Sequence, residues 1–312
     1  MRLVKLAEKL QVLAQFSAKE KLYIVLSAVL GRLFSAISDL WTTISADYHE
    51  PKTFFAELLA AGHNTKKIRD TNLVTIRGDV DLGDYYFLVR RRTSDVPTAQ
   101  VVLMRKEYRP LIDLISRQRA QGSIEYIVDV GANVGYGTIF FKKIFPNATC
   151  VAVEPDLGNY RILLENIRIN NFEKVSPIQA ALWTSEERLV TIRSFRDARD
   201  WAISVVDASN DSVNTVEGIK IDKLIEAHSL PRIDVLKMDI EGTEALIFRP
   251  DEHPERFLSK VRFLALEIHE ETNCREQILE TLRQSEYAMS FHSETVFGVN
   301  RKWSKSHVFT GA

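Results

Sequence analysis

A glycine-rich loop follows a short apolar run near the middle of the chain. The run covers 127–130, and residues 129–137 read Asp-Val-Gly-Ala-Asn-Val-Gly-Tyr-Gly. Gly131 permits a sharp turn, and Gly135 lets a ligand approach the backbone, where a helix that begins there offers N–H groups to an anion. The spacing predicts a cofactor-binding loop, although glycines this close together also occur in purely structural turns.

Two acidic residues stand near the ends of neighbouring apolar runs. Asp129 lies within the first run, where a carboxylate costs several kcal/mol to bury unless a cation pairs with it. Glu154 follows the second run, 148–153, at the place where an acid can accept hydrogen bonds from both ribose hydroxyls of a nucleoside. Loop capping is the structural alternative for both. Together with the glycine loop, they favour a nucleoside cofactor.

The glycine spacing also matches short-chain dehydrogenases, which bind NAD(P). However, an acid two residues before Gly131 suits a cationic ligand amine better than a pyrophosphate. The Tyr-x-x-x-Lys pair that such enzymes need, Tyr48 with Lys52, lies far upstream of the loop instead of after it. An NAD(P)-dependent oxidoreductase remains the alternative function.

Charged residues gather at the ends of two later apolar runs: Lys237, Asp239, Glu241, Glu244, Glu267 and His269. The carboxyl ends of parallel strands meet at one edge of a sheet, so we expect these side chains to lie together. The carboxylates offer hard oxygen ligands for Mg²⁺ or Ca²⁺, but an acidic helix start explains them equally well. A divalent metal is possible but not favoured, and we predict no metal site.

The elements that must position these residues alternate between strand and helix. Such alternation predicts a parallel sheet covered on both faces. The expected strands are 127–130, 148–153, 175–181, 233–238 and 263–268, with helices at 136–144, 160–169, 220–227, 243–247 and 275–285. Two further strands, 287–291 and 303–309, are joined by a turn and must pair antiparallel.

The residues before this region predict a different organisation. We expect amphipathic helices over 3–40, a helix at 54–59, a hairpin of 73–76 with 85–89, a break at Val96-Pro97, and a helix over 101–119 that Pro110 interrupts. The predicted domains are a helical extension (1–70), a hairpin-and-helix lid or entrance (71–120) and a catalytic domain (121–312).

The composition indicates which classes of partner and which location the protein has. The 312 residues include 41 Lys+Arg and 42 Asp+Glu, and a net charge of -1 argues against a protein that coats nucleic acid. The longest apolar run, 22–30, is shorter than the ~20 residues that span a bilayer, so we predict no transmembrane segment. Two cysteines outside any Cys-x-x-Cys pair fit a cytoplasmic location. A homodimer through the N-terminal helices is a further expectation.

Taken together, the motifs resemble the FkbM family of S-adenosylmethionine-dependent methyltransferases. The matching strings are 128–135, 153–156, 164–166, 236–244 and 266–269, with an upstream signature at 92–96 and 107–108. The resemblance implies a Rossmann-like α/β fold whose seven-stranded, mostly parallel sheet has an antiparallel C-terminal strand. It covers about residues 85 to 309 and leaves out the first forty.

The resemblance also implies how S-adenosylmethionine would be bound and S-adenosylhomocysteine left as product. Asp129 would take the methionine amino group, and the backbone of Gly131 to Gly135 the methionyl end. Asn133 would either shape this loop or also contact the cofactor. Glu154, followed by Pro155, would hold the ribose. The adenine would lie near Gln179, Ala180 and Ala181; Ala180 stands where many related enzymes have an acid, which puts a side-chain bond to the adenine amine in doubt.

The implied reaction is methyl transfer to a hydroxyl of a small molecule, a sugar or secondary metabolite. His269 is the first candidate for the general base, because its ordinary pKa of ~6.5 is near neutral. Asp239 is the alternative and could also stabilise the sulfonium, while Glu241 and Lys237 complete the catalytic group. Trp201, Ser204 and Glu267 are candidate acceptor contacts. A histidine after a strand is often structural, and a non-catalytic protein that binds S-adenosylmethionine remains open.

Overall fold

The computed structural model describes residues 54, 58, 62–68, 71–90, 93–118, 124–192, 204–207 and 215–305. Two compact units divide the chain, one ending at Met104 and one beginning at Arg105. The predicted helices of 3–40 and the candidate contact Trp201 lie outside the described residues. Within the described part, no helix has the length and apolar character needed to cross a membrane.

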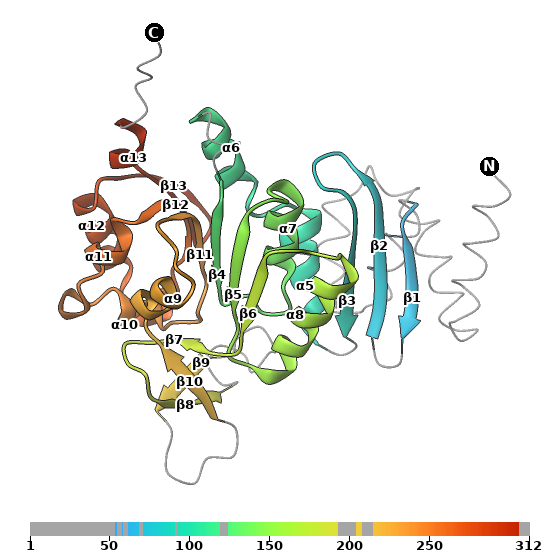
Figure 1. Ribbon diagram of the computed structural model, residues 1–312, viewed down its shortest axis with the longest axis horizontal. Helices are drawn as coiled ribbons and strands as arrows, with labels where there is room; N and C mark the ends of the chain where they lie inside the picture. The colour runs from blue at the N-terminus through green and yellow to red at the C-terminus, as the bar shows by residue number, and fades with distance from the viewer. Residues whose placement is uncertain are drawn as a thin grey trace, which may run out of the picture. The chain divides into compact units, whose positions relative to one another are not determined.

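A seven-stranded sheet forms the centre of the unit that begins at Arg105 (Figure 1). Its strands are β4 (Tyr126–Val130), β5 (Thr149–Val153), β6 (Val175–Ile178), β11 (Ile233–Met238), β12 (Val261–Glu267), β13 (Tyr287–His292) and β14 (Thr295–Asn300). Their order is β13-β14-β12-β11-β4-β5-β6. The strand β14 runs antiparallel to both neighbours, and the other pairs are parallel. The predicted Rossmann-like arrangement is confirmed.

Strand order reverses beside β4, which pairs with β5 on one side and with β11 on the other. Asp129 of β4 is in register with Lys237 of β11. Because successive side chains point to opposite faces, these two share the face opposite Val130 and Met238, which belong to the main apolar core. The register thus places an acid and a cation side by side at the switch point, where ligands of such sheets bind.

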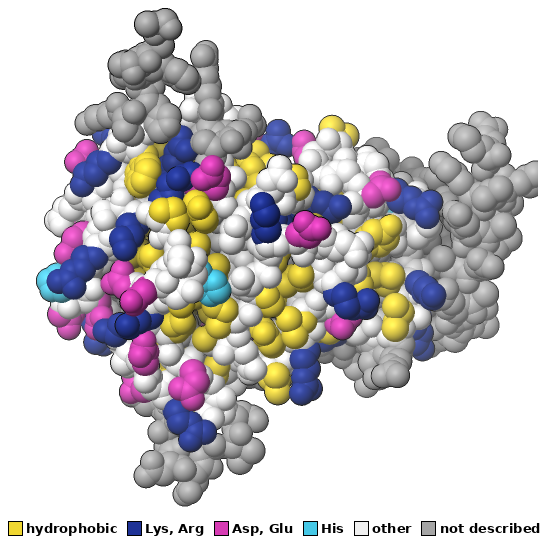
Figure 2. Space-filling model, in the orientation of Figure 1, with side chains coloured by type: hydrophobic (Ala, Val, Ile, Leu, Met, Phe, Trp, Pro, Cys, Tyr) yellow, Lys and Arg dark blue, Asp and Glu magenta, His cyan; other side chains and the backbone are white. Residues whose placement is uncertain are grey.

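Helices cover both faces of this sheet. They are α6 (Arg109–Arg117), α7 (Tyr136–Ile144), α8 (Leu157–Ile169), α9 (Ile221–Ala227), α10 (Glu244–Ile247), α11 (Glu255–Leu258), α12 (Arg275–Gln284) and α13 (Arg301–Lys305), with 3-10 turns η4 (Pro250–Glu252) and η5 (Glu270–Thr272). Buried residues of α9 to α12 pack with Val128 and Val130 in one core. Helices α6 and α7 contact β12 and β4. On the face drawn in Figure 2, acidic and basic side chains are intermixed.

A second, four-stranded sheet lies in the segment between β6 and α9. It consists of β7 (Ala181–Leu182), β8 (Arg188–Ile192), β9 (Ser204–Asp207) and β10 (Thr215–Ile219), in the order β7-β10-β8-β9. The prediction of one strand over 175–181 is therefore wrong. The main-sheet strand ends at Ile178, and Ala181 pairs with Gly218 of β10 instead. That pairing joins segments far apart in sequence, which no local apolar pattern reveals.

The predicted last strand, 303–309, is also wrong. The strand β14 occupies Thr295–Asn300, Trp303 lies in α13, and residues 306–309 lie outside the described part. His292 pairs with Thr295, so β13 and β14 form a tight hairpin. Gly298 disguised the strand in the sequence, but a Cβ there would lie 2.9 Å from the Tyr287 ring. The glycine is therefore required by close packing within the sheet.

The unit that ends at Met104 contains an antiparallel sheet of β1 (Asn64–Ile68), β2 (Thr71–Asp79) and β3 (Gly83–Arg90). The predicted hairpin is β2 with β3, and β1 was not predicted. Next come α5 (Asp95–Ala99) and a π-helical turn, η2 (Gln100–Met104). The expected break at Val96-Pro97 is wrong: Pro97 lies in the first turn of α5, where its missing N–H needs no partner. The helix predicted over 101–119 is interrupted, but at residues 105–108; Pro110 lies in the first turn of α6, which begins at Arg109.

Candidate active site

The glycine loop after β4 is held against the end of β5. The backbone N–H groups of Gly131 and Ala132 both donate to the carbonyl oxygen of Val153, at 3.0 and 2.9 Å. Gly131 has φ +71°, and a Cβ there would lie 1.6 Å from the backbone oxygen of Asp239. Gly135 has φ +88° and caps the N-terminus of α7. These glycines are therefore required by backbone shape, which brings the β4 loop directly against the β11 loop.

Asp129 is fully buried at the start of this loop. Its Oδ2 accepts a hydrogen bond from Thr138 Oγ1 at 2.7 Å. Its Oδ1 lies 3.5 Å from Lys237 Nζ and accepts no hydrogen bond from any residue that the structure describes. Buried acceptors are normally satisfied. Oδ1 is thus suited to a donor supplied by a ligand, such as an ammonium group.

Glu154 joins the two loops that follow β4 and β5. Its Oε2 accepts from the backbone N–H of Asn133 at 2.8 Å, and its Oε1 accepts from the backbone N–H of Asp156 at 3.0 Å. Burial raises the pKa of Glu154 to about 7, against the effect of these hydrogen bonds. Asn159 Nδ2 also donates to Oε1 at 3.3 Å. A carboxylate has about four acceptor sites, so the remaining capacity for a ligand hydroxyl lies on Oε2. Pro155 follows it in the turn before α8.

The remaining predicted cofactor contacts lie after β6. The backbone N–H of Glu154 donates to the carbonyl of Ile178 at 3.0 Å, which ties this loop to the end of β5. Gln179 is exposed, whereas Ala180 and Ala181 are buried. Their contact with the adenine of a cofactor stays a prediction.

Lys237 connects the glycine loop to the acidic residues. Its Nζ donates to the carbonyl of Gly131 at 2.6 Å and lies 3.6 Å from Asp239 Oδ2. Burial alone lowers the pKa of Lys237, but Asp239, Asp129 and two further acids outweigh it and raise the pKa above its ordinary value. Lys237 is therefore a fixed cation and is unsuited to accept a proton.

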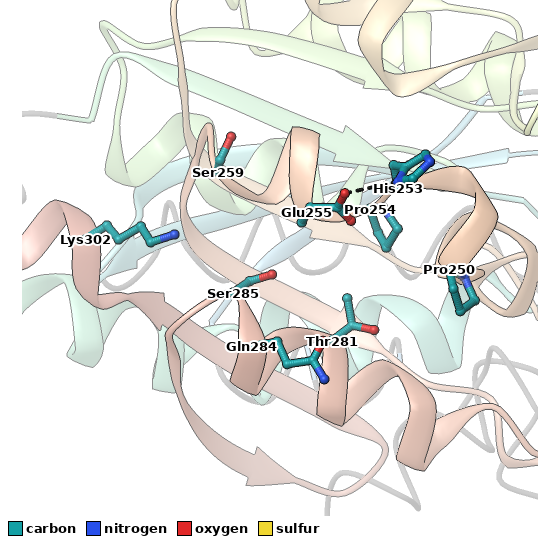
Figure 3. Close-up of a pocket in the computed structure, with 9 residues that line it drawn as sticks. All are labelled: Pro250, His253, Pro254, Glu255, Ser259, Thr281, Gln284, Ser285 and Lys302. Carbon is teal, nitrogen blue, oxygen red and sulfur yellow. Dashed lines mark hydrogen bonds and ion pairs between the residues drawn. The ribbon is translucent and has the colours of Figure 1, made fainter.

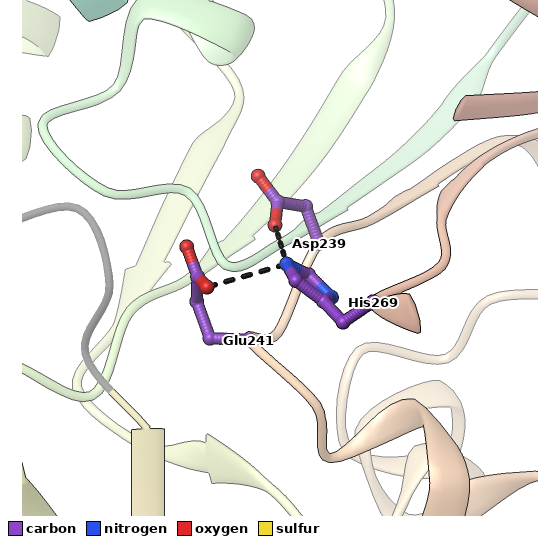
Figure 4. Close-up of side chains that lie close together, drawn as sticks. All are labelled: Asp239, Glu241 and His269. Atoms are coloured by element: carbon purple, nitrogen blue, oxygen red, sulfur yellow. Dashed lines mark ion pairs between the residues drawn. The ribbon is translucent and has the colours of Figure 1, made fainter. Parts of the chain in front are cut away.

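Three predicted side chains converge beyond the ends of β11 and β12 (Figure 4). His269 Nε2 lies 3.2 Å from Glu241 Oε2 and 3.8 Å from Asp239 Oδ1. His269 is fully buried, whereas the side chains of Glu241 and Asp239 are 13% and 28% exposed. The cluster of Asp239, Glu241 and His269, called the triad cluster below, therefore opens toward solvent on the side of Asp239.

The other ring nitrogen of His269 is fixed by Glu244, a residue that the sequence argument did not assign. Nδ1 lies 3.2 Å from Glu244 Oε1. Glu244 is fully buried and accepts from the backbone N–H groups of Ile240 and Gly242, each at 2.8 Å. Burial lowers the pKa of His269, but hydrogen bonds to Glu241 and Glu244 and the charge of Asp239 raise it to about 11. The imidazole is thus protonated at neutral pH.

Further carboxyls adjoin the triad cluster. The pKa of Glu267 is raised well above its usual range, chiefly by the charge of Asp239 and then by burial. Burial and the charge of Asp239 likewise raise the pKa of Glu107 to about 7. Burial also raises the pKa of Tyr108, which packs against Phe141 with ring centroids 5.2 Å apart. Sequence reasoning noted Glu107 and Tyr108 only as part of a resemblance.

The candidate acceptor contacts are only partly placed. Glu267 ends β12 beside the triad cluster, as expected. Ser204 begins β9 in the second sheet. The role of these residues as acceptor contacts stays a prediction.

A pocket of about 550 Å³ lies elsewhere, beside α11 and the end of α12 (Figure 3). It is lined by Pro250, His253, Pro254, Glu255, Ser259, Thr281, Gln284, Ser285 and Lys302. Ser259 precedes β12, so the pocket adjoins the amino end of that strand. Ligands of doubly wound sheets bind at the carboxyl ends, which leaves the loops after β4, β5, β11 and β12 as the candidate active site.

The sequence profile of the methyltransferase FkbM domain matches residues 129–291, more than half of the chain. The chain belongs to the FkbM methyltransferase family. The matched part of the FkbM domain begins at Asp129 and includes Glu154, the triad cluster and Glu244. Glu107 and Tyr108 lie upstream of it.

Curated relatives of the chain include two methyltransferases. Methyltransferase 1 of Beauveria bassiana is 25% identical over 148 residues, which are 41% of this chain and 59% of that protein. Methyltransferase sdnD of Sordaria araneosa is 26% identical over 184 residues, 49% of this chain and 70% of that protein. The match thus spans about three fifths of the first relative's length.

Solved structures similar to the chain include the N-terminal domain of human METTL16, with 11% identity, a TM-score of 0.41 and coverage of 81% of each chain. Fibrillarin of Aeropyrum pernix with bound S-adenosyl-L-methionine has 15% identity and a TM-score of 0.34, and the similarity covers 56% of this chain and 66% of that one.

Proposed function

We propose that the FkbM domain binds S-adenosylmethionine and transfers its methyl group to a hydroxyl oxygen of a small molecule, a sugar or secondary metabolite. The observation that supports this best is the buried Oδ1 of Asp129, which accepts no hydrogen bond from the described residues. It stands beside a glycine loop that contacts the loop of Asp239. S-adenosylmethionine carries an ammonium and a sulfonium group. It would therefore supply one cation to Asp129 and another to the loop of Asp239.

In this proposal each part of the cofactor has its own residues. Asp129 binds the amino group, the backbone of 131–135 the methionyl end, and Glu154 with Pro155 the ribose. The loop of Gln179, Ala180 and Ala181 lies near the adenine. When bound, S-adenosylmethionine supplies an electrophilic methyl group on a positively charged sulfur. Residues 121–312 would form the catalytic domain.

The chain's own residues would align the acceptor and take its proton. His269 holds a proton already, because the carboxylates around it raise its pKa to about 11. Of the two base candidates, Asp239 is therefore favoured. The charge of Asp239 raises the pKa of Glu267, so Glu267 tends to keep its own proton and Asp239 is the carboxylate that accepts one from the acceptor hydroxyl. As the oxygen bonds to the methyl carbon, the carbon–sulfur bond breaks and its electron pair stays on sulfur.

Lys237 would act as a positioning residue. It donates to the carbonyl of Gly131 and pairs with Asp129 and Asp239, so it couples the shape of the cofactor loop to the acidic residues. Glu241 would complete the catalytic group, and Glu267, Ser204 and Trp201 would contact the acceptor. A cytoplasmic location and a homodimer through the N-terminal residues are further proposals, the first supported by two buried free cysteines, Cys150 and Cys274.

The proposal is tested by incubation of the full chain with methyl-labelled S-adenosylmethionine and a metabolite extract, followed by mass spectrometry of labelled products. We expect a labelled O-methyl ether. A labelled N-methyl product would overturn the choice of oxygen. Binding of S-adenosylhomocysteine without any transfer would favour a non-catalytic protein. Thermal stabilisation by NAD or NADP instead of S-adenosylhomocysteine would favour the oxidoreductase.

A further inference from the structure

The triad cluster combines an imidazole and two carboxylates from two neighbouring strand ends. Asp239 and Glu241 follow β11, and His269 follows β12. One ligand atom from each lies within 4.8 Å of the others. Figure 4 shows both carboxylates pointing toward the same edge of the imidazole. Such a mixed nitrogen and oxygen set is a known way to hold a transition-metal ion.

The spacing of these atoms suits one shared cation. With ligand bonds of about 2.1 Å, two ligands at right angles lie about 3 Å apart, and two on opposite sides about 4.2 Å apart. Nε2 of His269 lies 3.2 Å from Glu241 Oε2 and 3.8 Å from Asp239 Oδ1. Both separations fall inside this range, so a cation would fit with small side-chain movements.

The orientation of His269 is fixed by a residue outside the triad cluster. Glu244 binds Nδ1 from a fully buried position, and two backbone N–H groups hold its carboxylate. In metal sites the second ring nitrogen of a ligating histidine almost always donates to such a partner, which fixes the tautomer and aims Nε2 at the ion. The arrangement of Glu244 thus matches the support of a metal ligand, independently of the carboxylates beside Nε2.

We propose that Asp239, Glu241 and His269 bind a divalent transition-metal cation of the Mn²⁺ class, which displaces the Nε2 proton of His269 on binding. Imidazole in the set disfavours Ca²⁺ and Mg²⁺, which prefer oxygen ligands, and the two carboxylates suit Mn²⁺. The exposed side of Asp239 leaves room for acceptor oxygens on the cation.

The role of the cation rests on the proposed function. A hydroxyl held beside a divalent cation loses its proton more readily. With Asp239 serving as a ligand, this proton leaves to solvent on the exposed side of Asp239. The freed oxygen then attacks the methyl carbon, and sulfur keeps the electron pair of the broken bond. The sequence-based expectation of no metal site would then be replaced.

The test is titration of the full chain with Mn²⁺, followed by electron paramagnetic resonance, which detects the free ion. We expect one saturable site, weakened about 100-fold in Glu241→Gln and His269→Gln, since each removes a direct ligand. The matched control is His253→Gln with Glu255→Gln, an exposed pair with the same 3.2 Å separation that belongs to no three-residue cluster of ligand side chains among the described residues. Mn²⁺ affinity should not change in this control.

Absence of a saturable site, or equal Mn²⁺ affinity in Glu241→Gln and wild type, would overturn the metal proposal. Glu241 is partly exposed, so this variant keeps the test valid if the His269 variant does not fold; circular dichroism checks both. S-adenosylhomocysteine binding is measured separately by calorimetry without metal. If the chain binds S-adenosylhomocysteine but not Mn²⁺, only the metal site is refuted. If it binds Mn²⁺ but not S-adenosylhomocysteine, the cofactor proposal is refuted.

Discussion

The two halves of the candidate active site are stabilised in different ways. After β4 and β5, polar groups mostly have fixed partners: Glu154 binds two backbone N–H groups, and Asp129 binds Thr138. After β11 and β12, carboxyls crowd one another, and Asp239 raises the pKa of Glu267. Backbone shape thus determines the loops after β4 and β5, called the cofactor half. Charge dominates the loops after β11 and β12, called the acceptor half. The four predictions below test this difference, from the largest expected effect to the smallest.

Lys237 spans the two halves, so its loss should have the largest effect. Lys237→Met leaves Asp129 without its buried cation, and we expect a loss of about 3–5 kcal/mol in unfolding free energy, together with weaker S-adenosylhomocysteine binding. Lys142→Met is the matched control, because Lys142 is also buried and donates to two backbone carbonyls, of Pro146 and Ala148. Denaturant unfolding and calorimetry should show lower stability in the control but normal cofactor affinity. If both variants bind S-adenosylhomocysteine with wild-type affinity, Lys237 has no role in cofactor binding.

Gly131→Ala tests the shape of the cofactor half. The new Cβ would lie 1.6 Å from the Asp239 carbonyl oxygen, so the loop must move. We expect a loss of about 3 kcal/mol or more and loss of S-adenosylhomocysteine binding in calorimetry. Gly78→Ala has a similar φ of +64° but open space around it, and should cost about 1–2 kcal/mol. Equal costs at the two positions would contradict a packed loop.

Glu154→Ala separates binding from structure within the cofactor half. Loss of the ribose contact should weaken S-adenosylhomocysteine binding about tenfold, equivalent to about 1.4 kcal/mol. The control Asp156→Ala removes the cap of α8, where Asp156 accepts from the N–H of Asn159 at 2.8 Å. That change should lower stability by about 1 kcal/mol with little change in affinity. The ribose assignment fails if calorimetry gives the same affinity for Glu154→Ala and wild type.

The pH dependence probes the charge of the acceptor half. The pKa of Glu107 is about 7 in the folded protein and near its ordinary value of 4.5 when unfolded, so between these values the folded state binds more protons. Its contribution to stability is present below pH 4.5 and is lost as pH rises through 7. Glu107→Gln should remove about 1–2 kcal/mol of this pH-dependent loss between pH 5 and 7. Denaturant unfolding at pH 5 and at pH 7 measures this change in unfolding free energy. If the variant shows the same change as wild type, the raised pKa of Glu107 is refuted.

The sequence predicts the cofactor half of the site more fully than the acceptor half. Asp129, Gly131 and Glu154 could be placed because each stands at the end of an apolar run, and parallel strands bring such ends together. The meeting of Asp239 and His269 follows from the same rule. Glu107 could not be placed, because it lies upstream of the first strand of the sheet. Glu244 was expected in the charged group after β11, but its contact with Nδ1 of His269 could not be predicted, because Glu244 reaches the ring from a helix. The pairing of β7 with β10 was missed for the same reason: it joins distant segments.

The protonation of His269 was also beyond the sequence. Its ordinary pKa suggested a base, but the carboxylates of Glu241 and Glu244 raise that pKa to about 11. Charge at a site depends on every neighbour within a few ångströms, and those neighbours come from different elements.

The central claim is that the loops after β4 and β5 bind S-adenosylmethionine. A crystal structure of the full chain with S-adenosylhomocysteine tests it most directly. We predict the ligand amino group within hydrogen-bond distance of Asp129 Oδ1 and the ribose hydroxyls on Glu154. Density for the ligand in the pocket beside α11 and α12, or no bound ligand at saturating concentration, would contradict the account.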